Sequence, residues 1–282
     1  MELLTQDFND DLLAAAESGD LAKIRALLAE GADLNAKNSN GQTPLMLAAG
    51  TFGRIETVRT LLSAGAAMNA QDISGRTALV MAILANDVDM VQALLANGAD
   101  IELKHGLGTT PLMLAVSSSA KIVPFLLAKG ANVNAKDNIG KTVLMWAVDL
   151  QFHRHNLIAD IVQALLEKGA DVNAKDDKGQ TVLIWASSAM DKNEFNPSTL
   201  EVLLTNGADV NAKDNRGQTA LMRVVAVSQG TMPGFPAHVC VKALLAHGAD
   251  VNAMDVAGQT VLMRAHGNAL ITGMLKKAGA KK

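Results

Sequence analysis

The sequence predicts an all-α fold, a solenoid of about eight stacked helix pairs separated by glycine-containing turns. A Gly-x-Thr triplet returns from Gly41 to Gly258 at intervals of 34, 33, 32, 39, 38 and 41 residues. A Gly-Ala marker that begins at Gly31 and a Leu-Leu pair that begins at Leu27 return at the same intervals. Because three markers follow one changing interval, they indicate a repeated structural unit whose copies stack on one another.

The first unit, residues 1–34, is predicted to be an N-terminal cap. Residues 9–11, Asn-Asp-Asp, supply capping side chains and negative charge in front of an inner helix at residues 12–16. An outer helix then carries an apolar stripe of Leu21, Ile24, Leu27 and Leu28. Gly31 ends this helix, because glycine accepts the left-handed conformation of the residue after a helix.

The second unit shows the pattern that the later units repeat. Residues 38–41, Asn-Ser-Asn-Gly, are typical of a turn. Thr43 is placed to cap an inner helix, and Pro44 fits its first position, where no backbone donor is needed. Apolar residues recur at helical spacing on both helices of the pair: Leu45, Ala48 and Ala49, then Ile55, Val58, Leu61 and Leu62. One pair cannot bury this face alone, so stability depends on stacking.

The third and fourth units, at 75–101 and 108–133, are compact but contain two irregularities. Residues 103–107, Leu-Lys-His-Gly-Leu, depart from the Asn-Ala-Lys-Asp run of other units, so we expect a distorted turn there. Pro124 falls early in the outer helix of the fourth unit, where we expect a kink or a late start.

The fifth, sixth and seventh units are longer. The distance from the motif threonine to the next Gly-Ala marker grows from 20–22 residues to 26–29 residues. The extra residues fall between the inner and outer helices, at 149–156, 188–197 and 228–238. They hold Phe152, Phe195 and Phe235. Such insertions usually lie on one face of a repeat protein, often the binding face. We therefore predict that these phenylalanines contact a partner; the alternative is that each covers its own helix ends.

The combination of motifs resembles the ankyrin repeat. The resemblance rests on Thr-Pro-Leu at 43–45 and 110–112, the Gly-Ala markers, the Leu-Leu pairs and runs such as Asn-Ala-Lys-Asp at 134–137. It implies a single domain over 1–282, with an N-terminal cap at 1–34, six repeats over 35–257 and a C-terminal cap at 258–282. It also implies β-turn or hairpin fingers and a surface for a protein partner, but no chemistry.

One departure from the family concerns the histidine of its Thr-Pro-Leu-His motif. That histidine is missing from every unit, and its position is held by apolar residues: Met46, Val80, Met113, Met145, Ile184, Met222 and Met263. We therefore expect an adaptable thioether seam in place of histidine hydrogen bonds.

The resemblance also places the fourth residue after each motif threonine on or beside the concave groove. This position reads Leu47, Met81, Leu114, Trp146, Trp185, Arg223 and Arg264. Trp and Arg are enriched at binding hot spots, so Trp146, Trp185, Arg223 and Arg264 are predicted contacts. The alternative is that the two tryptophans pack as core. His153 and Arg154 of the first long segment are added as contacts.

The turn tips form a third predicted surface. They are Asn40, Ile73, Ser74, Leu107, Ile139, Lys178, Arg216 and Val256. Four of these are apolar where solvent is expected, and Ile139 and Arg216 are the tips that we predict as contacts.

The bulk properties restrict the function further. A formal net charge of −3 gives no global case for nucleic-acid binding. No apolar run approaches the length of a membrane helix. The single Cys240 permits no internal disulfide. The Gly-Leu-Gly of residues 106–108 lacks the third glycine and the strand of a dinucleotide-binding motif. No cofactor or metal is predicted.

The sequence therefore predicts a non-catalytic interaction module, a monomer that binds another protein and inhibits, masks or regulates it. Two alternatives stay open: a metal-binding or enzymatic role through His153, His155 and His238, and a structural spacer or self-associating array. The compartment is not predicted. The chain would be cytoplasmic if Met1 is the natural start, and periplasmic or secreted if a signal peptide precedes it.

Overall fold

The computed structural model describes residues 2–149, 158–188, 197–227, 237–265 and 267–281. In these residues the chain forms 16 α-helices, and its only β-structure is a set of isolated bridges. The predicted all-α class is therefore confirmed. The backbone packs as two compact units, unit 1 (Met1–Asn132) and unit 2 (Val133–Lys282). The prediction of one continuous domain stays a prediction.

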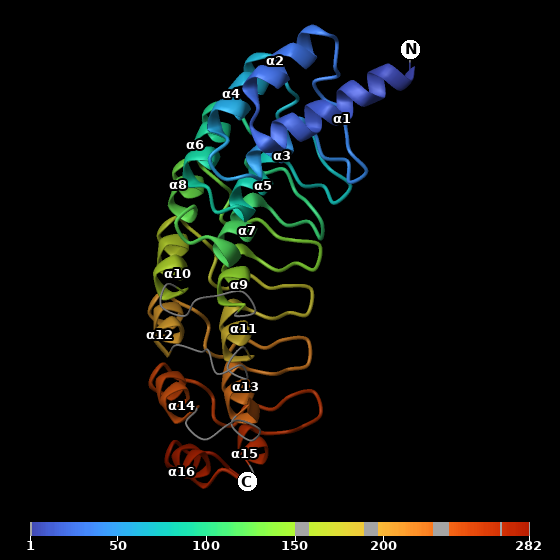
Figure 1. Ribbon diagram of the computed structural model, residues 1–282. Coiled ribbons are helices and arrows are strands. Elements are labelled where there is room, and N and C mark those ends of the chain that lie inside the picture. The colour runs from blue at the N-terminus through green and yellow to red at the C-terminus, as the bar shows by residue number, and fades with distance from the viewer. Residues whose placement is uncertain (1, 150–157, 189–196, 228–236, 266, 282) are drawn as a thin grey trace. The chain divides into compact units, whose positions relative to one another are not determined.

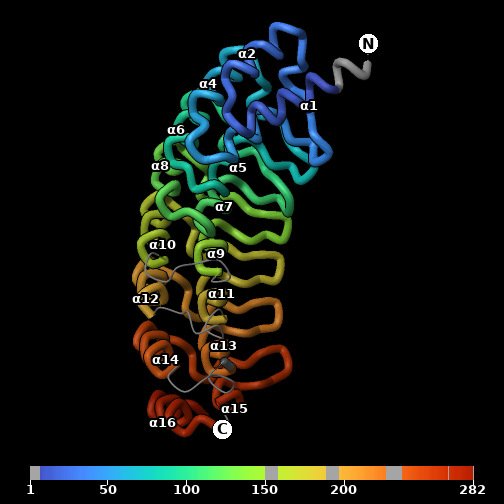
Figure 2. Tube along the Cα trace, viewed as in Figure 1, coloured from blue at the N-terminus to red at the C-terminus, as the bar shows by residue number. Residues whose placement is uncertain are grey.

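Unit 1 contains four helix pairs, in which an inner row of helices packs beside an outer row (Figure 1). Its helices are α1 (Glu2–Ser18), α2 (Leu21–Ala29), α3 (Pro44–Ala49), α4 (Ile55–Ser63), α5 (Ala78–Leu84), α6 (Val88–Ala96), α7 (Pro111–Ser118) and α8 (Val123–Ala128). The odd-numbered helices form the inner row. Segments that we call fingers join each outer helix to the next inner helix and project to one side (Figure 2).

Unit 2 repeats this arrangement. Its helices are α9 (Val143–Val148), α10 (Ile158–Glu167), α11 (Val182–Ser188), α12 (Pro197–Thr205), α13 (Ala220–Val227), α14 (Ala237–Ala246), α15 (Val261–Arg264) and α16 (Ala269–Lys277). Helices α9, α11, α13 and α15 contact one another in sequence, and so do α10, α12, α14 and α16. Equivalent positions of consecutive repeats therefore form rows along the unit.

Two sequence expectations are refined by the structure. The first inner helix begins at Glu2, ten residues before the predicted start at Leu12. Leu4, Phe8 and Leu12 recur at helical spacing, which extends the helix toward the N-terminus. Helix α8 begins late, at Val123, and has only six residues, because Pro124 can be accommodated only in a first turn.

The predicted threonine caps are confirmed. Thr43 and Thr142 each accept a hydrogen bond at Oγ1 from the backbone N–H three residues later, at 3.3 Å. The apolar seam behind these caps is buried in six of seven units, and only Met263 of the last unit is exposed. In two caps a methionine of the seam also accepts a hydrogen bond. The backbone N–H of Thr110 donates to Met113 Sδ, and the backbone N–H of Thr142 donates to Met145 Sδ.

Hydrogen bonds tie each finger to its neighbour within a unit. In unit 2 the tip bonds run from Asp177 N to Ile139 O, from Asn215 N to Lys178 O and from Val256 N to Arg216 O, at 2.9–3.2 Å. Asparagine side chains make a second connection; Asn173 accepts from Asp209 N and donates to Gly207 O. The turn at 103–107 keeps the backbone bonds of the regular fingers, since His105 N donates to Thr109 O as Asp137 N donates to Lys141 O. It differs only locally, because Gly106 has φ = +50° and Thr109 N donates to His105 O.

One buried hydroxyl in unit 2 has no hydrogen-bond partner among the described residues. Ser187 Oγ is fully buried, at a position where other repeats carry Ala49, Ile83, Val116 and Val225. An unsatisfied buried hydroxyl costs about 1–3 kcal/mol. We expect Ser187→Ala to stabilise the protein by about 1 kcal/mol, measured as a shift of the urea unfolding midpoint.

The neighbouring Ser188 provides the control for this prediction. Ser188 Oγ donates to the Ile184 carbonyl at 2.9 Å, so Ser188→Ala should leave stability unchanged or slightly reduced. Equal effects of the two substitutions would contradict the assignment.

Candidate functional site

The predicted groove residues of unit 2 form one row, which we call the groove row: Trp146, Trp185, Arg223 and Arg264. They occupy the same position on α9, α11, α13 and α15, the consecutive inner helices of the unit. All four side chains are partly buried, so they are neither fully exposed contacts nor fully buried core residues. Their placement agrees with the predicted row, and their role as partner contacts stays a prediction.

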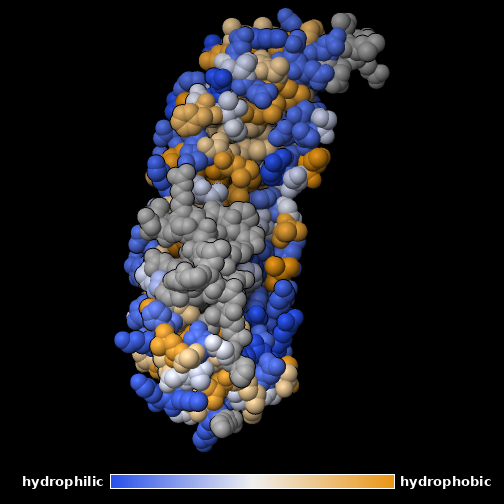
Figure 3. All heavy atoms as spheres, turned by 60° about the horizontal axis from the view of Figure 1, so that its bottom comes forward, coloured by the Kyte–Doolittle hydropathy of each residue, from blue (hydrophilic) through white to orange (hydrophobic). Residues whose placement is uncertain are grey.

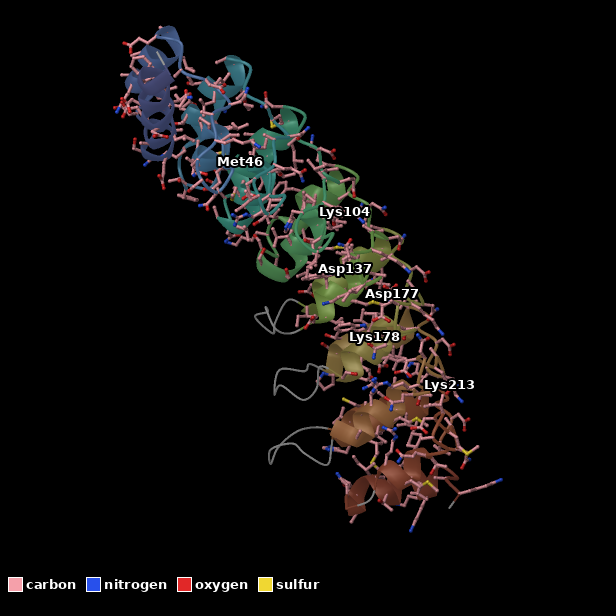
Figure 4. The ribbon with its side chains drawn as sticks, turned by 90° about the vertical axis from the view of Figure 1, so that its right-hand side faces the viewer. Met46, Lys104, Asp137, Asp177, Lys178 and Lys213 are labelled. Carbon is pink, nitrogen blue, oxygen red and sulfur yellow. The ribbon has the colours of Figure 1, made fainter. Side chains whose placement is uncertain are left out.

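Each member of the groove row is held by an aspartate nine residues earlier in the preceding finger. Trp146 Nε1 donates to Asp137 Oδ2 at 3.0 Å, and Trp185 Nε1 donates to Asp176 Oδ2 at 2.9 Å. The two arginines continue the pattern, with Arg223 paired to Asp214 and Arg264 paired to Asp255. Figure 4 shows Asp137 within unit 2, on the side from which the fingers project.

The same carboxylates also form the turns of the fingers. Asp176 Oδ1 accepts hydrogen bonds from the backbone N–H groups of Lys178 and Gln180, at 2.9 and 2.8 Å. One buried aspartate therefore fixes both a finger and a groove side chain, and this arrangement recurs in every repeat of unit 2. Sequence reasoning found the row but missed these aspartates, although their constant spacing of nine residues was available as a signal.

Lys141 is the second feature that sequence reasoning missed. Its ammonium lies over the rings of both Trp146 and Trp185, 4.2 and 4.6 Å from their centroids. It also pairs with Asp149 Oδ2 at 2.5 Å, and only 5% of the Lys141 side chain is exposed. Cation–π attraction of a desolvated lysine reaches about 2 kcal/mol. Lys141 thus joins the two indoles into one rigid group. The available signal was a lysine where four other repeats have glutamine.

Unit 1 has the same fingers but a different groove. Leu47, Met81 and Leu114 occupy the row position there, and none can bond to a carboxylate. Asp72 instead pairs with Arg76 Nε at 2.8 Å. Burial acts to raise the pKa of Asp72, but hydrogen bonds from the Arg76 backbone, the Arg76 guanidinium and the Ser74 backbone outweigh it and lower the pKa.

A lowered pKa makes the contribution of Asp72 to stability dependent on pH. The ionised group stabilises the folded state above its ordinary value of 3.8, and this stabilisation is lost as the pH falls through the lower folded pKa. We expect Asp72→Asn to cost about 1 kcal/mol at pH 7, because the pair with Arg76 is lost. The difference from wild type in urea midpoint should shrink below pH 3.8; a difference that is constant from pH 7 to pH 3 would contradict this account.

Asp255 in the last finger of unit 2 shows the same direction of shift. The backbone N–H of Gln259 is the main cause of its lowered pKa; burial opposes it, and the Arg264 guanidinium and the Ala257 N–H add to it. The Asp255 carboxyl is therefore ionised at neutral pH.

The two fingertip contacts predicted in unit 2 are accessible. Ile139 is 55% exposed, and Arg216 is also exposed. The apolar tips Ile73, Leu107 and Val256 are 75–76% exposed, which agrees with their expected position in solvent. On the face visible in Figure 3, apolar side chains form separate groups among hydrophilic ones. The contacts predicted in the long segments, Phe152, His153, Arg154, Phe195 and Phe235, lie outside the described residues.

Only one of the three histidines considered for chemistry lies in the described part of the chain. His238 is exposed on α14, while His153 and His155 lie outside the described ranges. The described residues contain no group of three His, Cys, Asp or Glu side chains that could hold a metal ion. Cys240 is fully buried, and burial raises the pKa of its thiol to about 12, which is the opposite of an activated nucleophile. No helix among the described residues meets the length and apolarity of a membrane span.

Comparison with protein families identifies the repeat. The family described as ankyrin repeats (3 copies) matches residues 12–105, 86–176, 112–214, 153–230 and 183–282, which together span most of the chain. The chain belongs to the ankyrin-repeat family. The predicted repeat solenoid is thereby confirmed, and ankyrin repeats are generally non-catalytic modules for protein–protein interaction. No curated protein matched the chain.

This chain departs from the usual ankyrin repeat in two respects. A thioether seam takes the place of the family histidine, which the sequence lacks. The side chains at the row position also differ between the two units. Unit 1 presents aliphatic side chains at the row position, whereas unit 2 presents the only two tryptophans of the protein and two arginines. The row in unit 2 therefore consists of hydrogen-bonded, partly exposed side chains.

Proposed function

We propose that this ankyrin-repeat protein acts as a monomer that binds a partner protein through the groove row of unit 2 and the adjoining fingertips. Binding would inhibit, mask or regulate the partner by occupying its surface. The single observation that carries the proposal is the row itself: Trp146, Trp185, Arg223 and Arg264 on consecutive inner helices, each bonded to an aspartate.

The bonded aspartates support contact with a partner because they reduce the cost of binding. A long or large side chain that is immobilised on binding loses about 0.5–1.5 kcal/mol of conformational freedom. In the groove row this freedom is already restricted in the free protein, and Lys141 restricts the two indoles further. Partly buried Trp and Arg side chains that are rigid in advance have the properties of binding hot spots.

Phe152, Phe195 and Phe235, together with His153 and Arg154, extend this proposal to the long segments. In the sequence they lie between the inner helices that carry Trp146, Trp185 and Arg223 and the outer helices that follow. Large apolar groups next to a hot-spot row are what the centre of an interface requires.

The decisive experiment uses leucine substitutions, because Leu47 and Leu114 occupy the row position in unit 1 and show that leucine suits this fold. A partner would be identified by co-purification from the native organism and its affinity measured by calorimetry. Trp146→Leu and Trp185→Leu should each weaken binding by about 10–100-fold. Phe52→Leu, at an exposed aromatic side chain of unit 1, is the control and should have no effect.

The tryptophans also supply a direct readout. The protein has two Trp and no Tyr, so its near-ultraviolet fluorescence reports on the groove row of unit 2. A partner that covers the row should change the emission. A partner that binds folded Trp146→Leu and Trp185→Leu variants with wild-type affinity would remove the groove from the proposal. Light scattering coupled to a sizing column tests whether the protein is a monomer.

A further inference from the structure

A row of lysines follows the fingers of unit 2, and we call it the lysine row: Lys136, Lys175 and Lys213. Each holds the same place in an Asn-Ala-Lys-Asp run, and all three are exposed. Each ammonium donates a hydrogen bond to a backbone carbonyl of the next finger, with acceptors Lys175 O, Lys213 O and Met254 O at 2.7, 3.1 and 3.1 Å. The fingers therefore hold the three charges in a regular line before any ligand is present.

The charge around this line is one-sided. The exposed side chains of the three finger segments 136–139, 175–178 and 213–216 include Lys178 and Arg216 as well as the lysine row. Their one exposed carboxylate is Asp177, because Asp137, Asp176 and Asp214 are buried and bonded to the groove row. At these tips five basic groups thus oppose one acidic group, in a chain whose net charge is −3. The other exposed carboxylates of the same fingers, Asp171, Asp209 and Asp250, lie before the tips, at the start of each Asn-Ala run. Figure 3 shows both hydrophilic and apolar side chains on the finger side of unit 2, and Figure 4 shows Asp177, Lys178 and Lys213 there.

The spacing of the row restricts the shape of a matching ligand. Neighbouring helices pack about 8–10 Å apart, so equivalent lysines of consecutive repeats are separated by a similar distance. An extended polyproline-type segment advances about 3.1 Å per residue and has three residues per turn. Every third side chain of such a segment therefore points the same way, at intervals of about 9 Å. An acidic residue at each third position would meet one lysine per finger.

An acidic polypeptide suits the row better than a nucleic acid. Single-stranded nucleic acids are bound by basic grooves combined with aromatic side chains on which bases stack. The fingers of unit 2, at 133–141, 169–180, 207–218 and 248–259, contain no aromatic residue. They carry instead the apolar tips Ile139 and Val256, which suit the side chains of a polypeptide.

We propose that the lysine row of unit 2 binds an extended acidic segment of the partner, with a carboxylate at about every third residue. This inference rests on the proposed function, because it assumes a protein partner and adds its chemistry. Opposite charges in register would speed the encounter and select the partner, while the groove row would supply most of the affinity.

The test uses the full chain and a synthetic probe, a fluorescein-labelled peptide of four Glu-Pro-Pro repeats, followed by anisotropy at low ionic strength. Replacing the lysine row with glutamine (Lys136→Gln, Lys175→Gln and Lys213→Gln together) should weaken binding about tenfold. The matched control removes the same charge from exposed positions in or beside the outer helices of unit 2: Lys168→Gln, Lys242→Gln and Lys276→Gln. The control should change affinity less than about twofold, because distant exposed charges are screened.

Two further probes separate the remaining outcomes. A peptide of the same composition with its four glutamates in one block should bind more weakly; equal binding would overturn the spacing. A single-stranded oligonucleotide that binds more tightly than the peptide, and is lost in the lysine-row variant, would overturn the polypeptide ligand. Equal losses of affinity in the two triple variants would show that only the net charge matters, and would overturn the role of the lysine row.

The groove variants distinguish this inference from the function on which it rests. Trp146→Leu and Trp185→Leu should change binding of the acidic peptide less than about twofold, because the lysine row is positioned by backbone carbonyls of the next fingers and not by the tryptophans. If the natural partner needs the tryptophans but binds the lysine-row variant with normal affinity, the proposal of an acidic segment is wrong and the groove proposal stands. If the acidic peptide binds through the row but the partner ignores the tryptophans, the groove proposal fails.

Discussion

Replacing Asp149 by alanine should destabilise the protein by about 3 kcal/mol, because it leaves the Lys141 ammonium buried without its carboxylate. Breaking a buried ion pair from one side typically costs about 3–5 kcal/mol, and the 18% exposure of the Asp149 side chain places this pair at the lower end. The two indoles retain their attraction for the ammonium, but they do not replace an opposite charge. The unfolding midpoint in urea, followed by circular dichroism, measures the loss.

A double-mutant cycle provides the control for this prediction. Lys141→Met removes the charge and keeps a flexible chain of similar length, so its cost should stay below about 1.5 kcal/mol. In the double variant, Asp149→Ala should cost much less than it does alone, because no ammonium is left unpaired. If Asp149→Ala proves as mild as Lys141→Met, the pair contributes little and the rigid two-indole group is not held as described.

The second large effect is expected at Gly140, where two fingers of unit 2 approach each other closely. Gly140 has φ = +73°, and a Cβ there would lie 2.6 Å from Asp177 Oδ1 and 2.8 Å from the Asp177 backbone nitrogen. That nitrogen donates to the Ile139 carbonyl, so the finger cannot move away without losing the bond. We expect Gly140→Ala to cost about 3 kcal/mol, from backbone strain and from separation of the fingers.

A substitution at Gly169 separates the cost of backbone strain from the cost of moving the fingers apart. It also has positive φ, +85°, but a Cβ at Gly169 would meet no atom within 4 Å. Gly169→Ala should therefore cost only the backbone strain, about 1–2 kcal/mol. Thermal unfolding of the two variants gives the comparison. Similar costs would show that the close approach of the fingers contributes nothing.

The repeat fold was predictable because its signals are local and periodic. Thr43 and Thr142 cap helices, Pro124 delays a helix, and Gly140 forms a turn for reasons contained in a few neighbouring residues. The start of α1 was predicted wrongly, because the prediction treats residues 2–11 as a polar entry. Leu4, Phe8 and Leu12 recur at helical spacing and could have marked the helix.

The groove row was predictable only in part. Its positions follow from the repeat, so Trp146 and Trp185 could be placed on consecutive inner helices from the sequence. The bonds to Asp137 and Asp176 could be suggested only by the constant spacing of nine residues, because the contacts depend on how each finger folds back over its helix. Lys141 stands out in the sequence only as a lysine where four other repeats have glutamine. Its contacts with the tryptophans of two consecutive repeats cannot be derived from that difference.

The thioether seam gives this protein a chemical vulnerability that a histidine seam would lack. Met46, Met113, Met145 and Met222 are buried to within 1% of complete exclusion from solvent, whereas Met263 is open. Oxidants should therefore convert Met263 to its sulfoxide first and reach the others only when a layer opens. A sulfoxide formed inside a layer is polar and cannot repack in the same space, so each transient opening in peroxide would become a permanent one.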